Sequence, residues 1–176
     1  MRSYLEAVQF HGHSCPGLAM GYRMTKAALD HFSIERAEDE ELVVIIENDA
    51  CGTDAVQLLS GCTFGKGNLI FKDYGKMIYT FYNRKSGKAI RISRPTKFKE
   101  SLTGKDLSRK EMINWILSAS KTEIVKLEEV TIPKPEFARI LKTVTCEFCG
   151  ETVTETRVYN LDGKVICIPC YEKLNN

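Results

Sequence analysis

Four of the seven cysteines form two CxxC pairs near the C-terminal end, and this spacing constrains the fold more than any other feature. The pairs are Cys146-Glu147-Phe148-Cys149 and Cys167-Ile168-Pro169-Cys170, and 17 residues separate them. Each CxxC turn offers two thiolates, and four thiolates satisfy tetrahedral zinc. The separation is typical of structural zinc sites. We therefore expect Cys146, Cys149, Cys167 and Cys170 to bind a structural zinc ion, while iron and four unrelated core cysteines remain the alternatives.

The residues around these pairs indicate the kind of zinc domain. Asp162-Gly163 is a hairpin signal between two short β-rich runs, and a helix is expected to begin near Tyr171. A knuckle, a hairpin and a second pair at a helix start are the parts of a treble-clef finger, which we place at residues 141–176. From Cys146 onward there are three basic and five acidic residues. This excess of acidic residues argues against a nucleic-acid-binding surface. It favours a role in packing, in dimer formation or in contact with a partner protein.

The other residues, 1–140, suffice for one ordinary domain. Of the 176 residues, 43% are hydrophobic, which allows a real core, and 27% are charged, with a net charge of +2. No apolar run approaches the roughly 20 residues of a membrane span, and the N-terminus lacks a signal peptide's apolar stretch. We therefore expect a cytoplasmic protein without a membrane partner, whose thiols stay reduced.

Hydrophobic periodicity predicts the elements of this first domain. Helices are expected at residues 3–10, 16–32, 54–59 and 108–118, the third of them capped by Asp54. Strands are expected at residues 42–46, 69–71, 76–82, 88–92 and 124–132. Helices packed on a mostly antiparallel sheet make an α+β core the predicted fold class.

A second group of metal-ligand residues lies near the N-terminus. His11, His13 and Cys15 occupy alternating positions, directly before the helix that Pro16 is expected to open. A thiolate beside imidazoles and at a helix N-terminus has a lowered pKa, which suits a nucleophile or a metal ligand. A second metal ion at His11, His13 and Cys15 is therefore one hypothesis, and a polar loop with a buried thiol is the other.

Two later motifs follow the buried strand at residues 42–46. Cys51-Gly52-Thr53-Asp54 comes directly after it, and a glycine-rich turn, Gly61-Cys62-Thr63-Phe64-Gly65-Lys66-Gly67, comes next. The turn is one residue too short for a P-loop and follows a helix, which argues against a nucleoside triphosphate. Lys66 and free amides could still hold an anionic group, whereas a tight turn with a solvated lysine is equally compatible with the spacing.

These motifs together carry a resemblance to a known family. The segment His11-Gly12-His13-Ser14-Cys15-Pro16-Gly17-Leu18, followed by the Cys51 and Gly61 blocks, resembles the FmdE family of formylmethanofuran dehydrogenase subunits over about residues 8–93. Some members of that family append a treble-clef zinc finger.

The resemblance implies an α+β core, a homodimer and one cleft that gathers the signature residues. It places His11, His13, Cys15, Cys51, Asp54, Cys62 and Lys66 in that cleft. We expect catalytic roles for His13, Cys15, Cys51 and Asp54, and cofactor binding by His11, Cys62 and Lys66. The resemblance also implies an association with the other subunits of a molybdenum or tungsten enzyme that interconverts carbon dioxide and a formyl group on methanofuran. It does not imply that this chain performs the reaction, since the metal-pterin chemistry belongs to those subunits.

One stretch is strongly basic. Residues 84–110 hold ten basic and two acidic residues, which would suit an anionic ligand, an acidic partner or simply solvated faces. Phe98 is the one aromatic residue among these charges, so no stacking platform for nucleic acid is visible.

Two functions fit these observations. In the first, the cleft acts on a small C1-carrier or related ligand, and the protein is an enzyme or an accessory part of one. In the second, the cleft belongs to a non-catalytic metal- or cofactor-sensing module that docks partners through the finger. A nucleic-acid adaptor is the weakest alternative.

Overall fold

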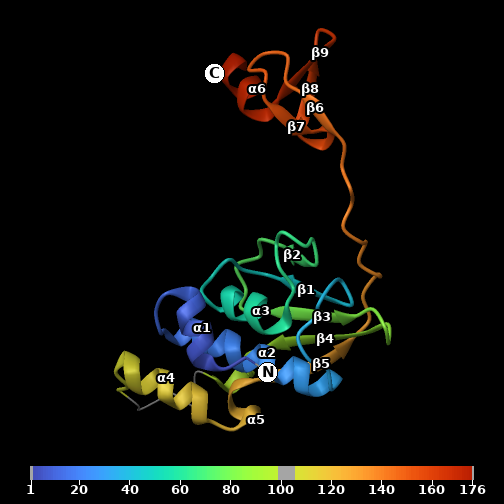
Figure 1. The fold of residues 1–176 in the computed structure, drawn as a ribbon. Coiled ribbons are helices and arrows are strands. Elements are labelled where there is room, and N and C mark those ends of the chain that lie inside the picture. Colours follow the sequence, from blue (N-terminus) through green and yellow to red (C-terminus); the bar gives the residue numbers. More distant parts are fainter. Residues whose placement is uncertain (1, 99–105, 176) are drawn as a thin grey trace. The chain divides into compact units, whose positions relative to one another are not determined.

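The computed structural model describes residues 2–98 and 106–175, which divide into two compact units (Figure 1). The units are Met1–Ala138, here called the core unit, and Arg139–Asn176, here called the finger unit. The sequence placed the boundary between residues 140 and 141.

The core unit contains a five-stranded sheet in the order β2-β1-β3-β4-β5. Its strands are β1 (Leu42–Ile46), β2 (Leu69–Phe71), β3 (Tyr79–Asn83), β4 (Lys88–Ser93) and β5 (Lys126–Val130). Only the β1–β2 pair of this sheet is parallel; the other three pairs are antiparallel. The prediction of an α+β fold with a mostly antiparallel sheet is therefore confirmed.

Helices α1 (Tyr4–His11), α2 (Pro16–Phe32), α3 (Gly52–Ser60) and α4 (Arg109–Ser118) belong to the core unit, together with the short η1 (Thr96–Phe98) and α5 (Lys121–Ile124). Helix α2 contacts α1, α3 and α4 and also packs against β3 and β4. The main hydrophobic core between helices and sheet contains Met24 and Leu29 from α2 and Tyr79, Phe81 and Ile90 from the strands.

Several predicted boundaries differ from the structure; the helix expected to begin near Tyr171, for example, begins at Ile168. Three differences concern the core unit. The strand expected at residues 76–82 begins only at Tyr79. The strand expected at residues 124–132 is preceded by α5, which a capping box from Ser120 and Glu123 starts. Helix α3 begins at Gly52, so Cys51 occupies the N-cap position and Asp54 lies in the first turn. Asp54 therefore does not cap α3, and its carboxylate is available to another partner.

The finger unit consists of two small hairpins and a helix. Strands β6 (Thr143–Thr145) and β7 (Thr152–Thr154) flank the first CxxC turn, and η3 (Glu155–Arg157) leads into β8 (Val158–Leu161). Strand β9 (Lys164–Cys167) pairs with β8, and α6 (Ile168–Asn175) follows at once. This order of knuckle, hairpin and helix is compatible with the predicted zinc finger.

Within the described ranges, no helix is both long and apolar enough to cross a membrane.

Candidate metal centres

Two clusters of metal-ligand side chains occur in the described part of the chain, one in each unit. The finger cluster consists of Cys146, Cys149, Cys167 and Cys170, whose sulfur atoms all lie within 4.8 Å of one another. Cys146 and Cys149 come from the turn between β6 and β7, Cys167 ends β9, and Cys170 lies in α6. The structure thus brings together the four residues that the sequence selected.

Hydrogen bonds and crowding shift the pKa values of the finger cysteines in opposite directions. The backbone amides of Cys167 and Cys149 lower the pKa of Cys146 to about 6, and the Cys167 amide lies 3.3 Å from the Cys146 sulfur. Neighbouring Cys167, and then burial, raise the pKa of Cys170 to about 12. Four thiols this close cannot all ionise without a cation to offset their charge, so the cluster fits a divalent metal.

The second cluster, here called the core cluster, consists of His11, His13, Cys15 and Cys51. Its ligand atoms also lie within 4.8 Å of one another. Chain elements far apart in sequence supply them: His11 ends α1, Cys15 is the N-cap of α2, and Cys51 is the N-cap of α3. The chain reverses at Gly12, whose φ of +93° favours glycine, and this turn places His13 beside His11.

His11 has the arrangement of a metal ligand held by a carboxylate. Its Nδ1 lies 2.6 Å from the Asp54 carboxylate, which can only accept, so Nδ1–H is the donor. With the proton on Nδ1, Nε2 is the ring atom that could bind a metal ion. That Nε2 atom is buried and has no hydrogen-bond partner among the described residues. A buried nitrogen without a partner is costly, whereas a metal ion in the core cluster would satisfy it. Metal-binding histidines usually donate their other nitrogen to a carboxylate in this way.

A close contact between two helices brings the core-cluster cysteines together. A Cβ atom on Gly21 of α2 would lie 2.3 Å from the Gly52 carbonyl oxygen of α3, so only glycine permits this approach. The contact places Cys51 beside Cys15, whose sulfur accepts the Leu18 amide at 3.3 Å. Burial, followed by the neighbouring Cys15, raises the pKa of Cys51.

The core cluster is open on one side. Cys15 is buried and His11 and Cys51 are half-buried, whereas His13 is exposed. A ligand could therefore approach a metal ion from the side of His13, in contrast to a fully enclosed structural site.

Tyr79, at the start of β3, is a residue that sequence reasoning missed. Its hydroxyl is buried without a hydrogen-bond partner among the described residues, and burial raises its pKa to about 12. A Cβ atom on Gly52 would lie 2.4 Å from this hydroxyl, which places the phenol directly against the start of α3. A tyrosine in a strand indicates a core position, and no signal in the sequence connects it with Cys51.

Cys62 and Lys66 do not belong to the core cluster. The Cys62 thiol donates to the Leu42 carbonyl at 3.2 Å, and burial raises its pKa to about 12. The Lys66 ammonium donates to the carbonyls of residues 37–39 at 3.1 to 3.5 Å. Cys62 thus contacts the first residue of β1 and Lys66 holds the loop before it, and their predicted role in cofactor binding stays a prediction.

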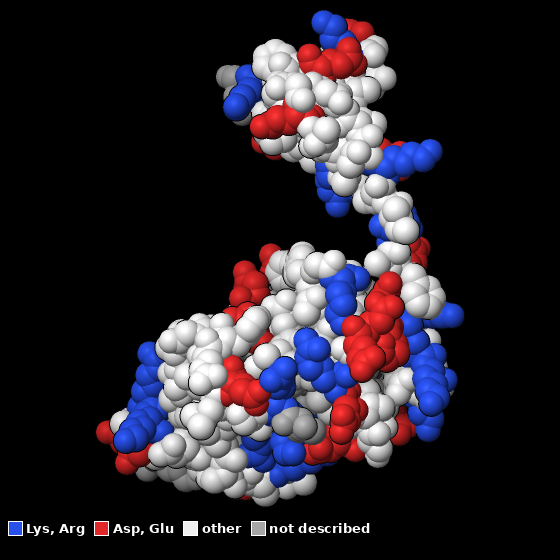
Figure 2. Space-filling view, viewed as in Figure 1, with Lys and Arg blue, Asp and Glu red and all other residues white. Residues whose placement is uncertain are grey.

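The basic stretch at residues 84–110 is partly neutralised. Arg84 lies 3.6 Å from Glu40, and Arg91 lies about 4 Å from both Glu47 and Glu128. Figure 2 shows basic and acidic side chains interspersed on the visible face of the core unit. Lys99, Glu100 and Lys105 of this stretch lie outside the described residues.

Comparison with known proteins gives three findings. The profile of the family described as "FmdE, Molybdenum formylmethanofuran dehydrogenase operon" matches residues 10–144. A curated protein of Archaeoglobus fulgidus, named "Probable S-adenosyl-L-methionine-binding protein", is 33% identical over 195 aligned residues, which cover 96% of this chain and 52% of the relative. The chain thus spans about half the length of that relative.

The third finding is a solved structure. The crystal structure of a protein from Syntrophus aciditrophicus, described as like the FmdE subunit of a tungsten formylmethanofuran dehydrogenase, matches with a TM-score of 0.73 at 26% identity. The match covers 98% of this chain and 94% of that one, so the similarity extends over both units.

Proposed function

The chain belongs to the FmdE family, and on that premise we propose that its core unit binds one transition-metal ion in the core cluster and uses it to hold a small ligand. His11 Nε2 and the sulfurs of Cys15 and Cys51 are the buried or half-buried donors, and His13 completes the set from the solvent side. Two imidazoles and two thiolates are donors that suit zinc and other late transition metals.

One observation carries this proposal, namely the buried His11 Nε2 that has no partner among the described residues while Asp54 holds Nδ1. In a polar loop without a metal, the surrounding residues would be expected to supply such an atom with a hydrogen-bond donor. Asp54 is therefore a positioning residue, which fixes the tautomer and the orientation of the His11 ring.

The ligand that we propose is a small C1-carrier, and the family description supports this choice. In this view the protein is an accessory component or a standalone relative of formylmethanofuran dehydrogenase. The exposed His13 is the ligand that an incoming molecule could displace, because its imidazole lies at the open side of the core cluster.

We further propose that the finger cluster holds a structural zinc ion and that the protein forms a homodimer. Four cysteine donors leave no open position on tetrahedral zinc, so the finger would serve as a folding and docking unit. Light scattering coupled to size exclusion would test the dimer, since a monomer mass at all concentrations would contradict it.

Metal analysis of three proteins tests the two sites separately. Elemental mass spectrometry is applied to the wild type, to Cys146→Ser/Cys149→Ser and to Cys15→Ser/Cys51→Ser. We expect two metal ions per wild-type chain and one in each variant. A core variant that retains all the metal of the wild type would refute the core site, and retention in the finger variant would refute the finger site.

A sensing module is the second candidate, and one observation favours it: four donors in the core cluster can close a tetrahedral shell without an added ligand. His13→Ala distinguishes the candidates. Metal affinity unchanged by this variant indicates a three-donor site with an open position, as an enzyme needs. A large loss of affinity indicates a closed site and favours sensing.

The names of the similar proteins suggest two ligands for direct tests. Titration calorimetry of the metal-loaded protein with methanofuran tests the C1-carrier proposal. S-adenosylmethionine, which the name of the Archaeoglobus relative mentions, is the competing ligand. Binding of S-adenosylmethionine alone would move the proposal from C1-carriers to that ligand.

A further inference from the structure

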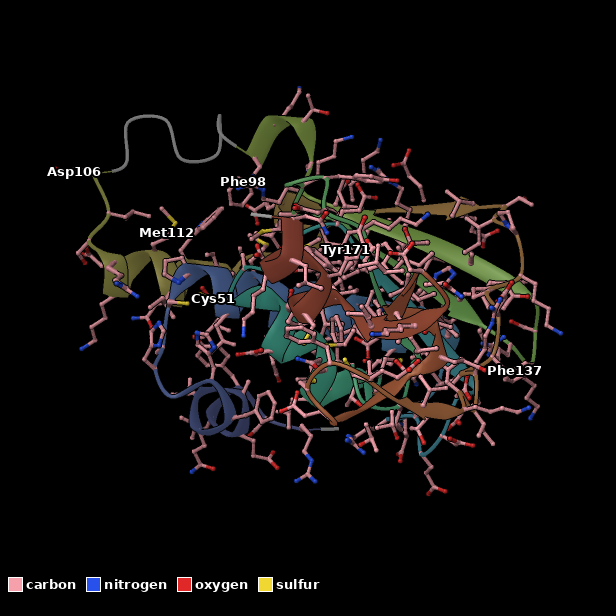
Figure 3. All side chains as sticks on the ribbon, turned by 90° about the horizontal axis from the view of Figure 1, so that it is seen from above. Cys51, Phe98, Asp106, Met112, Phe137 and Tyr171 are labelled. Carbon is pink, nitrogen blue, oxygen red and sulfur yellow. The ribbon has the colours of Figure 1, made fainter. Side chains whose placement is uncertain are left out.

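A pocket with a mainly apolar lining lies beside the core cluster. It has a volume of about 290 Å³, and its walls come from the start of α2, from α4, from η1 and from the segments that flank β3 and β4. Its lining includes Met20, Met77, Met112 and Phe98. Figure 3 labels Cys51, Met112 and Phe98, which lie on one side of the core unit. Flexible thioethers and an aromatic ring suit the face of a flat organic molecule.

A second hollow of about 410 Å³ adjoins this pocket. The two share Met77, Arg94 and Phe98 as lining residues, so they adjoin at these side chains. The volume of the second hollow lies in the range that small-molecule sites occupy.

Gly17 connects the pocket to the core cluster. It lines the pocket, and a Cβ atom at this position would lie 3.4 Å from Cys51 Cβ, 3.9 Å from the Cys15 sulfur and 4.0 Å from the Cys51 sulfur. Because Gly17 has no side chain, its backbone packs near both cysteines while it also lines the pocket, and neither cysteine lines the pocket itself. A molecule in the pocket would therefore reach the vicinity of a metal ion held by the two sulfurs.

Among the described residues, the charged side chains that line the two hollows are basic. Arg94 lies over the Phe98 ring, 5.1 Å from its centre, and within the described ranges its guanidinium has no hydrogen bond or ion pair. The Lys76 ammonium likewise has no such partner among residues 2–98 and 106–175. Neither hollow is lined by a described Asp or Glu residue. A guanidinium left unpaired at the edge of an apolar pocket is suited to a carboxylate, sulfonate or phosphate.

We propose that this pocket binds an organic anion with a flat apolar body, whose anionic group contacts Arg94 and whose other end faces Gly17 and the core cluster. The placement beside a metal rests on the proposed function, whereas the pocket and its anion preference do not. The structure thereby assigns the ligand of the core unit to a chemical class: aromatic or extended apolar acids.

A pair of fluorescent probes tests the anion preference. 1-Anilinonaphthalene-8-sulfonate has an aromatic body and a sulfonate, and N-phenyl-1-naphthylamine has the same body without the charge. We expect Arg94→Gln to weaken binding of the sulfonate about tenfold, as the loss of a charge-assisted hydrogen bond implies, and to leave the neutral probe unchanged. Arg91→Gln is the matched control, because Arg91 lies outside both hollows and pairs with Glu47 and Glu128.

Met112→Glu is the second variant, and it should weaken the sulfonate at least as much because it adds a negative charge to the wall. Circular dichroism of each variant verifies that the fold is retained. Equal sulfonate affinity in wild type, Arg94→Gln and Met112→Glu would overturn the pocket proposal, as would an Arg94→Gln effect of the same size on both probes.

Cobalt tests the placement beside the metal. Thiolate-bound Co²⁺ absorbs visible light, so it should quench the bound sulfonate in the wild type, and Cys51→Ser should remove that quenching while the finger cluster keeps its metal. If the sulfonate binds in an Arg94-dependent way but Cys51→Ser does not change the quenching, the pocket is not beside the metal and the placement is overturned. A core cluster that takes up no Co²⁺ would refute the proposed metal function, and the Arg94 comparison would still decide the pocket.

Discussion

The core cluster and the finger cluster contain similar donors but differ in what surrounds them. Three of the four finger cysteines form most of the small buried cluster of their unit. That cluster otherwise includes Ile166 and the partly buried Val153, Leu161 and Tyr171. The core cluster lies at the edge of a unit whose main core of large side chains contains none of its four donors. A metal ion can therefore stabilise the fold of the finger unit, whereas in the core unit it can serve in ligand binding or catalysis.

Removal of the finger metal should have the greatest consequence. Cys149→Ser, or chelation of the wild type, should unfold the finger unit, because metal binding contributes about 10 to 16 kcal/mol in comparable zinc-finger peptides. The core unit should remain folded. Limited proteolysis with mass analysis would detect cleavage confined to residues 139–176. A finger that resists the protease after chelation would show that its small apolar cluster suffices.

Gly21→Ala should disturb the core cluster without removing a donor. The new Cβ atom would meet the Gly52 backbone at 2.3 Å, and overpacking of this kind costs about 1 to 3 kcal/mol. We expect a lower melting temperature of the core unit and weaker metal binding there, with finger metal unchanged. Gly65→Ala is the control, since nothing lies within 4 Å of a Cβ atom at that position. Equal stability of the two variants would contradict the close α2–α3 contact.

Asp54→Asn should lower the metal affinity of the core cluster about 10- to 100-fold, because the loss of a carboxylate that holds a metal ligand usually has this effect. The metal affinity of the finger cluster should not change, because this substitution alters no residue of the finger unit. Competition with a chromophoric chelator measures both affinities. Asp30→Asn, an exposed residue of α2 paired with Lys26, serves as the control. An unchanged core affinity would refute the positioning role of Asp54.

A cysteine that belongs to neither cluster should give the weakest effect. Burial raises the pKa of Cys62 from about 9 to about 12, so the folded state favours the neutral thiol. The stabilisation is fully present below pH 9 and is lost as the pH rises toward 12, with about 1.4 kcal/mol lost by pH 10. Urea unfolding of the core unit at pH 8 and pH 10 measures this loss. Cys62→Ala should lose less unfolding free energy than the wild type between pH 8 and pH 10. An equal loss in the two proteins would contradict the burial argument.

Much of the site was predictable from local spacing. His11, His13 and Cys15 are close in sequence, so either a turn or an extended segment brings them together, and the prediction that they cluster is confirmed. The α+β class was predictable because segments with the pattern of strands and segments with helical periodicity both occur in the core unit. The start of α3 was predicted wrongly, because Asp54 resembles a helix cap, whereas in the structure its carboxylate binds His11.

Local spacing in the chain was enough to define the finger cluster, because each CxxC pair is closed by one turn and the pairs needed only a hairpin between them. The packing of distant elements, in contrast, selected Cys51 and Asp54 to join the histidines and left Cys62 and Lys66 out. That choice depends on the approach of Gly21 to Gly52, which lets α3 lie against α2. The pocket beside Gly17 has the same origin, since its walls come from segments that meet only after the helices pack on the sheet.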